Sequence, residues 1–232
     1  MENTQELKMR LQSIRTRIEK AARAYGRNPE SVRLVAVIKS VPIHRVREAI
    51  EAGVTILGEN YVQEARAKIS DLSDYPISWH FIGRLQSNKA KYAVRLFDLI
   101  HSVDTLKLAS ELNKQAVKIK KIQDILVQVN ISEEATKSGV SIQDTQQLLE
   151  DLSDFDHLAV KGLMTMPPFF NDPEKVRPFF AALHELRNRL GQRLPHVTLN
   201  ELSMGMTGDF EVAIAEGATL VRIGTAIFGE RK

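Results

Sequence analysis

The spacing of apolar side chains divides this chain into a leading helix and a series of short strands and amphipathic helices. In residues 5–25, apolar side chains recur every three to four positions, which is the spacing of one helical face. They are Leu7, Leu11, Ile14, Ile18 and Ala22. Several later runs are nearly continuous in apolar residues, which is typical of parallel strands covered on both faces. The predicted strands are 33–38, 54–58, 78–82, 97–101, 124–130, 158–163, 197–201 and 219–223.

Helix signals fill the intervals between these strands. Pro42, Asp104 and the pair at 172–173 stand where helices are expected to begin, and Gly53 and Gly217 stand where helices are expected to end. Strict alternation of strand and helix requires right-handed crossovers and a parallel sheet. The predicted helices are 43–52, 60–70, 86–93, 105–118, 141–151, 173–190 and 207–216.

Eight strands separated by seven helices predict an α/β fold. The expected architecture is a single TIM-like (β/α)8 barrel, one domain over residues 1–232, with an extra N-terminal helix. Eight such units can close into a barrel, and about 250 residues is the typical size. The alternative is an open, doubly wound sheet. The barrel is favoured because no Gly-x-Gly-x-x-Gly turn follows the first strand.

The charge balance and the lack of cysteine narrow the function classes. The 232 residues include 32 basic and 29 acidic side chains, and the two signs are interspersed. Nucleic-acid-binding proteins usually gather Lys and Arg on one face, so we expect no nucleic-acid partner. The densest basic run, residues 118–121, is interpreted as a solvated helix end. Without cysteine there is no disulfide and no thiolate metal site, and no metal is expected.

The sequence carries no signal for export or for a membrane. Its first residues are polar and lack the apolar segment of a signal peptide. The longest aliphatic stretch, residues 34–38, is far too short to span a bilayer. We therefore expect a soluble, cytoplasmic protein, and the lack of cysteine fits a reducing compartment.

A lysine ends the first predicted strand. Lys39 follows the five apolar residues 34–38, at the end of the barrel where strands lead into loops and active sites form. Partial desolvation favours the neutral amine, which is the nucleophile that forms a Schiff base with an aldehyde. A lysine that simply extends from a strand end into water is the alternative, and position alone favours that alternative.

The last two strand ends favour a nucleophilic Lys39 over a solvated lysine. The segment 202–209 contains Ser203 and opens a helix, and the eighth strand contains Arg222 and leads into Gly224 and Thr225. Barrel phosphate sites frequently use these two loops. Glycines let the backbone approach a ligand, hydroxyls donate hydrogen bonds, and arginine supplies a fixed charge. An anion site near a nucleophilic lysine suggests a phosphorylated aldehyde, either pyridoxal phosphate or a sugar phosphate.

Two other strand ends carry polar residues whose roles stay open. Glu59 and Asn60 follow the second strand, where capping of the next helix is an equally good interpretation. His80 lies in the apolar third strand, and a histidine there is more often a satisfied core residue than an acid or a base.

Motifs at these positions make the chain resemble the pyridoxal phosphate homeostasis protein family. The motifs run through nearly the whole chain: 34–37 (LVAV), 58–64 (GENYVQE), 79–83 (WHFIG), 85–89 (LQSNK), 137–139 (KSG), 162–164 (GLM), 202–206 (LSMGM) and 221–229 (VRIGTAIFG). The resemblance implies a barrel like the N-terminal domain of alanine racemase (fold type III). It also implies pyridoxal 5′-phosphate (PLP) as cofactor, held as a Schiff base on Lys39.

The same resemblance implies the other contacts of the cofactor. Arg222 is expected at the ring nitrogen or the phosphate, and Asn60 near the ring. The expected phosphate contacts are Ser203, the backbone of Met206, Gly224 and Thr225.

The chain departs from the family pattern beside the lysine and after the third strand. Ile38 stands where Ser or Thr usually precedes the lysine, and Ser40-Val41-Pro42 follow where a second lysine is usual. Arg84 replaces the Pro or His that often follows Gly83. These departures alter the expected polarity of the pocket and leave the lysine itself in place.

Fold alone does not choose among functions, because barrels host many chemistries. The favoured hypothesis is a monomeric, non-catalytic carrier that buffers PLP and delivers it to apo forms of PLP-dependent enzymes. The alternatives are a PLP-dependent amino-acid racemase or decarboxylase, and a Schiff-base aldolase. Two-base racemisation needs a group on each face of the substrate, and the racemases that this chain resembles take one from a separate C-terminal domain. This sequence ends just after the eighth strand, so we expect no substantial catalysis.

Overall fold

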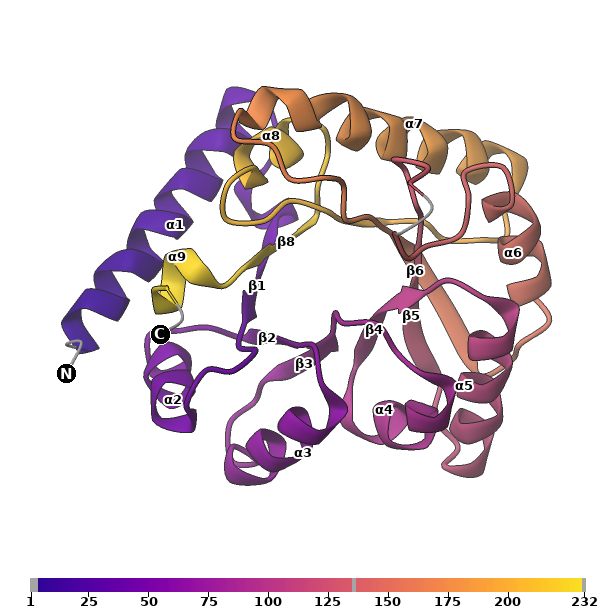
Figure 1. Cartoon of the computed structure of the whole chain (residues 1–232), viewed down its shortest axis with the longest axis horizontal. Helices are drawn as coiled ribbons and strands as arrows, with labels where there is room; N and C mark the ends of the chain where they lie inside the picture. Colours follow the sequence, from indigo (N-terminus) through magenta and orange to yellow (C-terminus); the bar gives the residue numbers. More distant parts are fainter. Residues whose placement is uncertain (1–3, 135–136, 231–232) are drawn as a thin grey trace.

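The computed structural model describes residues 4–134 and 137–230, and its strands form one closed parallel barrel in chain order (Figure 1). The last strand pairs with the first, with Val35 opposite Arg222, so the barrel is confirmed and the open sheet is wrong. The strands are β1 (Arg33–Val37), β2 (Ile56–Glu59), β3 (Ser78–Phe81), β4 (Leu99–Val103), β5 (Gln123–Gln128), β6 (Leu158–Met164), β7 (Glu201–Ser203) and β8 (Leu220–Ile223).

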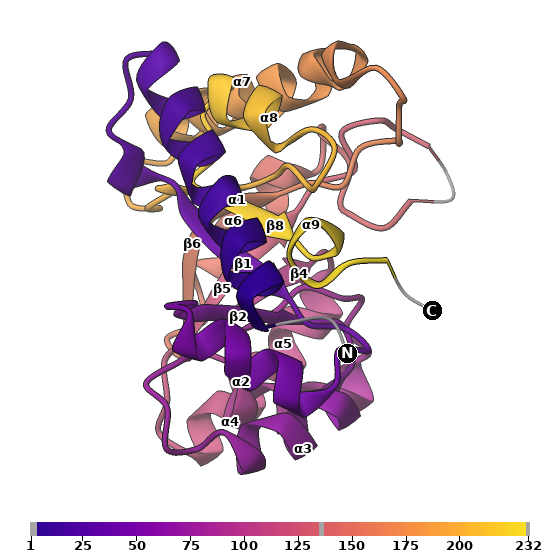
Figure 2. The same ribbon diagram turned by 90° about the vertical axis from the view of Figure 1, so that its left-hand side faces the viewer.

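Helices surround the barrel, and the leading helix α1 packs beside α8 and α9 (Figures 1 and 2). The α-helices are α1 (Thr4–Ala24), α2 (Ile43–Glu51), α3 (Val62–Asp71), α4 (Ala90–Leu96), α5 (Leu106–Lys118), α6 (Thr145–Leu152), α7 (Arg177–Arg193), α8 (Phe210–Ala215) and α9 (Thr225–Phe228). Short 3-10 turns are η1 (Pro29–Ser31), η2 (Ser87–Lys89) and η3 (Pro173–Val176). In the described part of the chain, no helix is both long and apolar enough to cross a membrane.

The predicted elements differ from the observed ones mainly near the C-terminal end. The seventh strand was expected at 197–201, yet the paired residues are Glu201–Ser203. The short helix α9 was not predicted, because one turn is too short to show a helical period. Gly53 and Gly217 follow α2 and α8 with φ of 90° and 98°, the left-handed conformation typical of a helix end.

Side chains alternate between the barrel interior and the layer beneath the helices. On β1, Val35 belongs to the interior cluster, whereas Ala36 and Ile38 belong to the outer core under the helices. The interior cluster consists of Val35, Ile56, Leu99, Leu126, Met164 and Leu220. Because a strand alternates with a period of two, Val37 faces the same side as Val35, and Lys39 lies in the turn just beyond β1, where it lines the cavity. The chain therefore brings Lys39 to the interior side at the carboxyl end of β1.

Candidate functional site

A cavity of about 1270 Å³ opens where the carboxyl ends of the strands meet. It exceeds the range of about 300–1,000 Å³ that small-molecule pockets usually span. Of the residues predicted for the site, those that line the cavity are Lys39, Asn60, Met206, Arg222, Gly224 and Thr225. Ser203 does not line it, because its side chain is fully buried below the cavity.

Lys39 lies half-buried at the β1 side of the cavity. The preceding residue is anchored, since the Ile38 amide donates to the Gly58 carbonyl oxygen at 2.9 Å and the Ile38 side chain is buried in the outer core. The Lys39 Nζ lies 5.2 Å from the centre of the Tyr61 ring, within the range of a cation–π contact. The Lys39 amine therefore lies on the cavity side, and the backbone just before it is fixed to β2 by the hydrogen bond of Ile38.

The three departures from the family pattern have different consequences in this structure. Ile38 packs under the helices, on the opposite face from the cavity, so it leaves the polarity of the cavity unchanged. Val41 does line the cavity, and it makes that part of the wall apolar. Arg84 is exposed and lies outside the cavity lining.

Arg222 forms a buried cationic part of the cavity wall. Its side chain reaches inward from β8, where Nη1 donates to the Ser203 Oγ at 2.5 Å and Nη2 donates to the Thr165 carbonyl oxygen at 2.9 Å. Burial lowers the pKa of Arg222 to about 10, and the carboxylate of Asp209 opposes that shift. With this pKa, Arg222 remains charged at neutral pH. A guanidinium has five N–H donors, so Arg222 keeps donors for an anion or a ring nitrogen.

Two histidines continue the polar chain that begins at Arg222. His101 Nδ1 lies 2.9 Å from the Ser203 Oγ, and His101 Nε2 lies 3.0 Å from His80 Nδ1. Arg222 can only donate, so the Ser203 Oγ accepts from it, and the Ser203 O–H is then free to donate a hydrogen bond to the Nδ1 of a His101 tautomer protonated on Nε2. His101 then carries its proton on Nε2 and donates to His80. In this arrangement the Ser203 hydroxyl proton and the His101 ring proton each have a hydrogen-bond acceptor.

Both histidines are held neutral. Burial lowers the pKa of His80 to about 3, and burial together with His80 and Arg222 lowers the pKa of His101 well below its usual value. Sequence reasoning interpreted His80 as a core histidine, which agrees with this placement. It did not single out His101, although alternation with Leu99 on β4 places both side chains on one face.

This pair predicts an acid-sensitive fold. Below pH 6.5 an unfolded chain protonates both imidazoles, whereas the folded protein keeps them neutral, so the unfolded state binds more protons. The free energy of unfolding is therefore expected to fall as the pH drops from 7 toward 4, by up to about 1.4 kcal/mol per pH unit for each histidine. Urea unfolding at successive pH values measures this slope.

Matched variants isolate the histidine contribution. His80→Asn is expected to flatten the slope, whereas His196→Gln is expected to keep it, because His196 is exposed. Equal slopes for the wild-type protein and His80→Asn would contradict the assignment of His80 as a buried neutral group.

The two loops predicted to bind phosphate lie on the wall formed by β7 and β8. The Met206 amide donates to the Asp209 Oδ1 at 2.6 Å, so the predicted backbone contact of Met206 is already satisfied within the loop. Burial raises the pKa of Asp209, while the Met206 amide and Arg222 lower it. Thr225 is exposed at the start of α9, where the first amides of a helix have no partner within the helix.

Asn60 lines the cavity and carries a buried acceptor, its Oδ1, without a hydrogen-bond partner among the described residues. Gly83 permits this placement, because a Cβ at that position would lie 2.3 Å from the Asn60 carbonyl oxygen. A buried acceptor without a partner is costly, so a ligand that donates a hydrogen bond fits this position.

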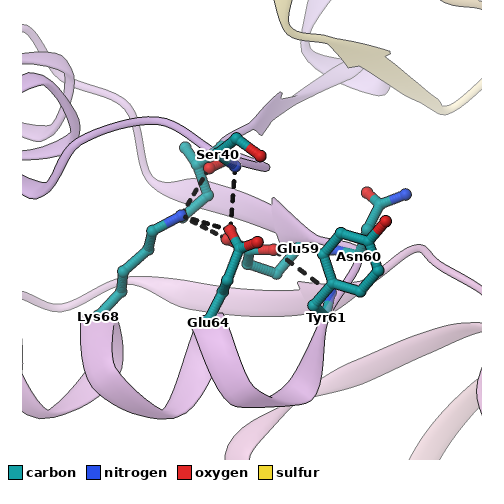
Figure 3. A network of polar contacts seen from close by, with 7 residues as sticks. Ser40, Glu59, Asn60, Tyr61, Glu64 and Lys68 are labelled. Carbon is teal, nitrogen blue, oxygen red and sulfur yellow. Dashed lines mark hydrogen bonds and ion pairs between the residues drawn. The ribbon is translucent and has the colours of Figure 1, made fainter.

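A buried polar cluster that the sequence did not reveal lies between β2 and α3 (Figure 3). The Glu59 side chain is fully buried, and its Oε1 lies 2.5 Å from the Lys68 Nζ. Burial raises the pKa of Glu59, and the ion pair with Lys68 opposes that shift. Glu59 was predicted either as a helix cap or as a site residue. In the structure its Oε2 accepts from the amides of Asn60 and Tyr61, at 2.8 and 3.4 Å.

Comparison with known proteins agrees with this geometry. The family described as alanine racemase, N-terminal domain, matches residues 9–232. The pyridoxal phosphate homeostasis protein of Aquifex aeolicus is 48% identical over 223 residues, covering 96% of this chain and 97% of that protein. The protein of the same name from Escherichia coli K12 is 40% identical over 224 residues, which covers 95% of each.

A solved structure extends this similarity to three dimensions. PipY of Synechococcus elongatus PCC7942, solved with PLP bound, aligns with a TM-score of 0.86 at 38% identity. The alignment covers 96% of this chain and 100% of that one. Full-length identity, the barrel and the cavity at its mouth agree with the resemblance drawn from the motifs. The chain belongs to the pyridoxal phosphate homeostasis protein family.

Proposed function

We propose that this protein holds PLP reversibly on Lys39 and hands it to apo forms of PLP-dependent enzymes, without substantial catalysis of its own. The observation that carries the proposal is the placement of a half-buried lysine and a buried arginine in one open cavity. The relatives that share 40–48% of its residues are named for PLP homeostasis, and PipY has been solved with PLP bound.

The residues of the cavity fit the chemical groups of PLP. The cofactor offers an aldehyde carbon, a ring with a nitrogen and a hydroxyl, and a phosphate. Lys39 supplies the amine for covalent attachment, and the buried acceptor of Asn60 suits a hydroxyl donor. Arg222 supplies charge-assisted donors. Thr225 and the backbone of Gly224 lie beside it on the lining and suit the phosphate.

Two predicted phosphate contacts enter this proposal in a modified form. Ser203 acts through Arg222, which its hydroxyl contacts directly, because Ser203 itself does not reach the cavity. The Met206 amide becomes available to a phosphate only when Asp209 releases it.

Two of the three carboxylates that line the cavity support a binding role in preference to catalysis. Glu48 accepts hydrogen bonds from Arg45 and Thr4, and Asp209 accepts from the Met206 amide. A general base must reach the proton that it removes, and Glu48 and Asp209 are already engaged, while the third carboxylate, Glu230, is exposed at the cavity edge. The proposed carrier acts as a monomer in the cytoplasm, where the lack of cysteine suits a reducing compartment.

Transfer to an acceptor enzyme tests the proposal. PLP-loaded protein is mixed with an apo PLP-dependent enzyme, and recovery of that enzyme's activity is followed beside a control that receives the same total PLP free in solution. We expect activity to recover, and we expect negligible turnover of common amino acids by the carrier alone. Robust racemisation or decarboxylation that Lys39→Ala abolishes would replace the carrier with an enzyme. Cleavage of a sugar phosphate, with a borohydride-trapped adduct at Lys39, would favour the aldolase.

A further inference from the structure

Two charged side chains of one helix contact the backbone on both sides of Lys39. Lys68 Nζ donates to the Ile38 carbonyl oxygen at 2.7 Å, just before Lys39 in the chain. Glu64 Oε2 accepts from the Ser40 amide at 3.0 Å, just after it. Lys68 and Glu64 both project from α3, one helical turn apart, toward the loop that follows β1 (Figure 3). The two peptide groups that flank Lys39 are therefore held by the same helix.

The backbone at this point adopts a conformation that needs such support. Ser40 has a φ of 58°, in the left-handed region that few residues other than glycine adopt without cost. The Ile38 carbonyl oxygen also accepts from the Val41 amide at 3.0 Å, which closes a tight turn around Lys39. Loss of the bond between Ser40 and Glu64 would let this turn relax, and the direction of the Lys39 side chain would change with it.

Lys68 also reaches the neighbouring strand end. Glu59 is the ion-pair partner of Lys68, and it also accepts the amides of Asn60 and Tyr61. Asn60 lines the cavity, and the Tyr61 ring lies 5.2 Å from the Lys39 Nζ. The ends of β1 and β2 are thus joined through one buried ion pair, which reaches the residue before Lys39 on one side and the residue whose ring lies beside the Lys39 amine on the other.

We propose that Glu59, Glu64 and Lys68 are positioning residues that hold the Lys39 amine in the orientation that captures PLP. This inference rests on the proposed function, because it assigns a role toward the same lysine. The three residues do not touch the cofactor in this proposal. They act through the peptide groups of Ile38 and Ser40 and through the Tyr61 ring.

Glu64 offers the cleanest test, because its side chain is 36% exposed and its removal breaks only a 3.5 Å contact with Lys68, leaving the shorter buried pair of Glu59 and Lys68 intact. Glu64→Ala removes the acceptor of the Ser40 amide, whereas Glu64→Gln keeps an acceptor oxygen in place. Gln63→Ala, an exposed neighbour on α3, is the matched control. The readouts are the rate of PLP capture by stopped-flow absorbance, the visible circular dichroism of the bound cofactor, and hydrogen exchange of residues 38–42 in the cofactor-free protein.

We expect Glu64→Ala to slow capture by roughly three- to tenfold, about 0.6–1.4 kcal/mol of barrier. Its visible dichroism is expected to weaken, and its 38–42 segment to exchange faster. Glu64→Gln and Gln63→Ala are expected to match the wild-type protein in all three measurements. A loss of fold stability alone would not produce rescue by glutamine together with a changed dichroism of the bound cofactor.

A double variant tests the buried pair without stranding one charge. Glu59→Gln with Lys68→Met removes both charges together, because a single removal would leave a buried ion uncompensated. We expect it to fold and to slow capture as Glu64→Ala does. Capture by Glu64→Ala at the wild-type rate with unchanged dichroism would overturn the positioning role. If the wild-type protein captures no PLP at Lys39, the proposed function fails and the inference falls with it, whereas hydrogen exchange would still show whether Glu64 holds the turn.

Discussion

Replacement of Lys39 by alanine is expected to abolish covalent attachment of PLP completely. The variant keeps Arg222 and the phosphate-side loops, so it retains weaker, non-covalent binding that falls by at least about tenfold. The visible absorbance band of the bound cofactor should disappear. Borohydride reduction followed by peptide mapping should find the adduct on Lys39 in the wild-type protein and no adduct on the variant.

The control for this experiment is another lysine on the same barrel. Lys91→Ala removes an exposed amine from α4, outside the cavity lining, and should leave the absorbance band and the mapped adduct unchanged. A reduced adduct found solely on another lysine of the wild-type protein would show that the assignment to Lys39 is wrong.

Arg222→Gln is expected to weaken PLP binding by roughly tenfold to a hundredfold. Hydrogen bonds to charged groups contribute about 1.5–3 kcal/mol, and 1.4 kcal/mol corresponds to a factor of ten in affinity. A comparison of PLP with pyridoxal decides which group Arg222 holds. If it holds the phosphate, the variant loses affinity for PLP alone. If it holds the ring nitrogen, affinity for both compounds falls in parallel.

Two further variants separate binding from folding. Arg84→Gln removes an exposed arginine outside the cavity and should bind PLP as the wild-type protein does. Arg222→Lys keeps the charge but loses the planar donors that contact Ser203 and Thr165, and an intermediate affinity is expected. Wild-type affinity in a folded Arg222→Gln would exclude Arg222 from the site.

The barrel was predictable because its strands are short apolar runs and its helices carry clear start and stop residues. The seventh strand shows where this reasoning stops. Residues 197–200 alternate apolar and polar side chains, so the pattern predicts an extended segment there, and the alternation breaks at the polar pair Asn200-Glu201. Pairing instead selects Glu201–Ser203, because Gly162 of β6 lets the backbone of Glu201 come close. A Cβ on Gly162 would lie 1.9 Å from the Glu201 carbonyl oxygen.

The site was predictable to the extent that parallel strands end at one mouth. That rule brought Lys39 and Arg222 together in expectation, the family resemblance added Asn60, and the structure places all three on one cavity. It could not show that Ser203 points into the barrel interior, because a residue at the end of a strand can face the cavity or lie beneath it. Side-chain hydrogen bonds to Arg222 and His101 decide the matter.

The cluster around Lys68 escaped sequence reasoning although a signal existed. Val62, Ala65 and Lys68 are three residues apart and share the buried face of α3. A lysine on an apolar stripe needs a buried partner, and Glu59 lies directly before that helix. Charged residues in helices are usually solvated, so the sequence pattern alone does not predict a buried Lys68. The ion pair becomes evident only when β2 and α3 are placed side by side.

The alternation of β1 has an evolutionary consequence. Ile38 packs in the outer core and Lys39 lines the cavity just beyond β1, so inserting or deleting a single residue between Arg33 and Val37 would shift the alternation that sets both environments. The amine would then enter the outer core and an aliphatic side chain would face the cavity. Only the insertion or deletion of two residues would keep each side chain on its original side of the strand. Length variation among descendants of this sequence should therefore accumulate before Arg33, in the turn that enters the strand from the far end of the barrel.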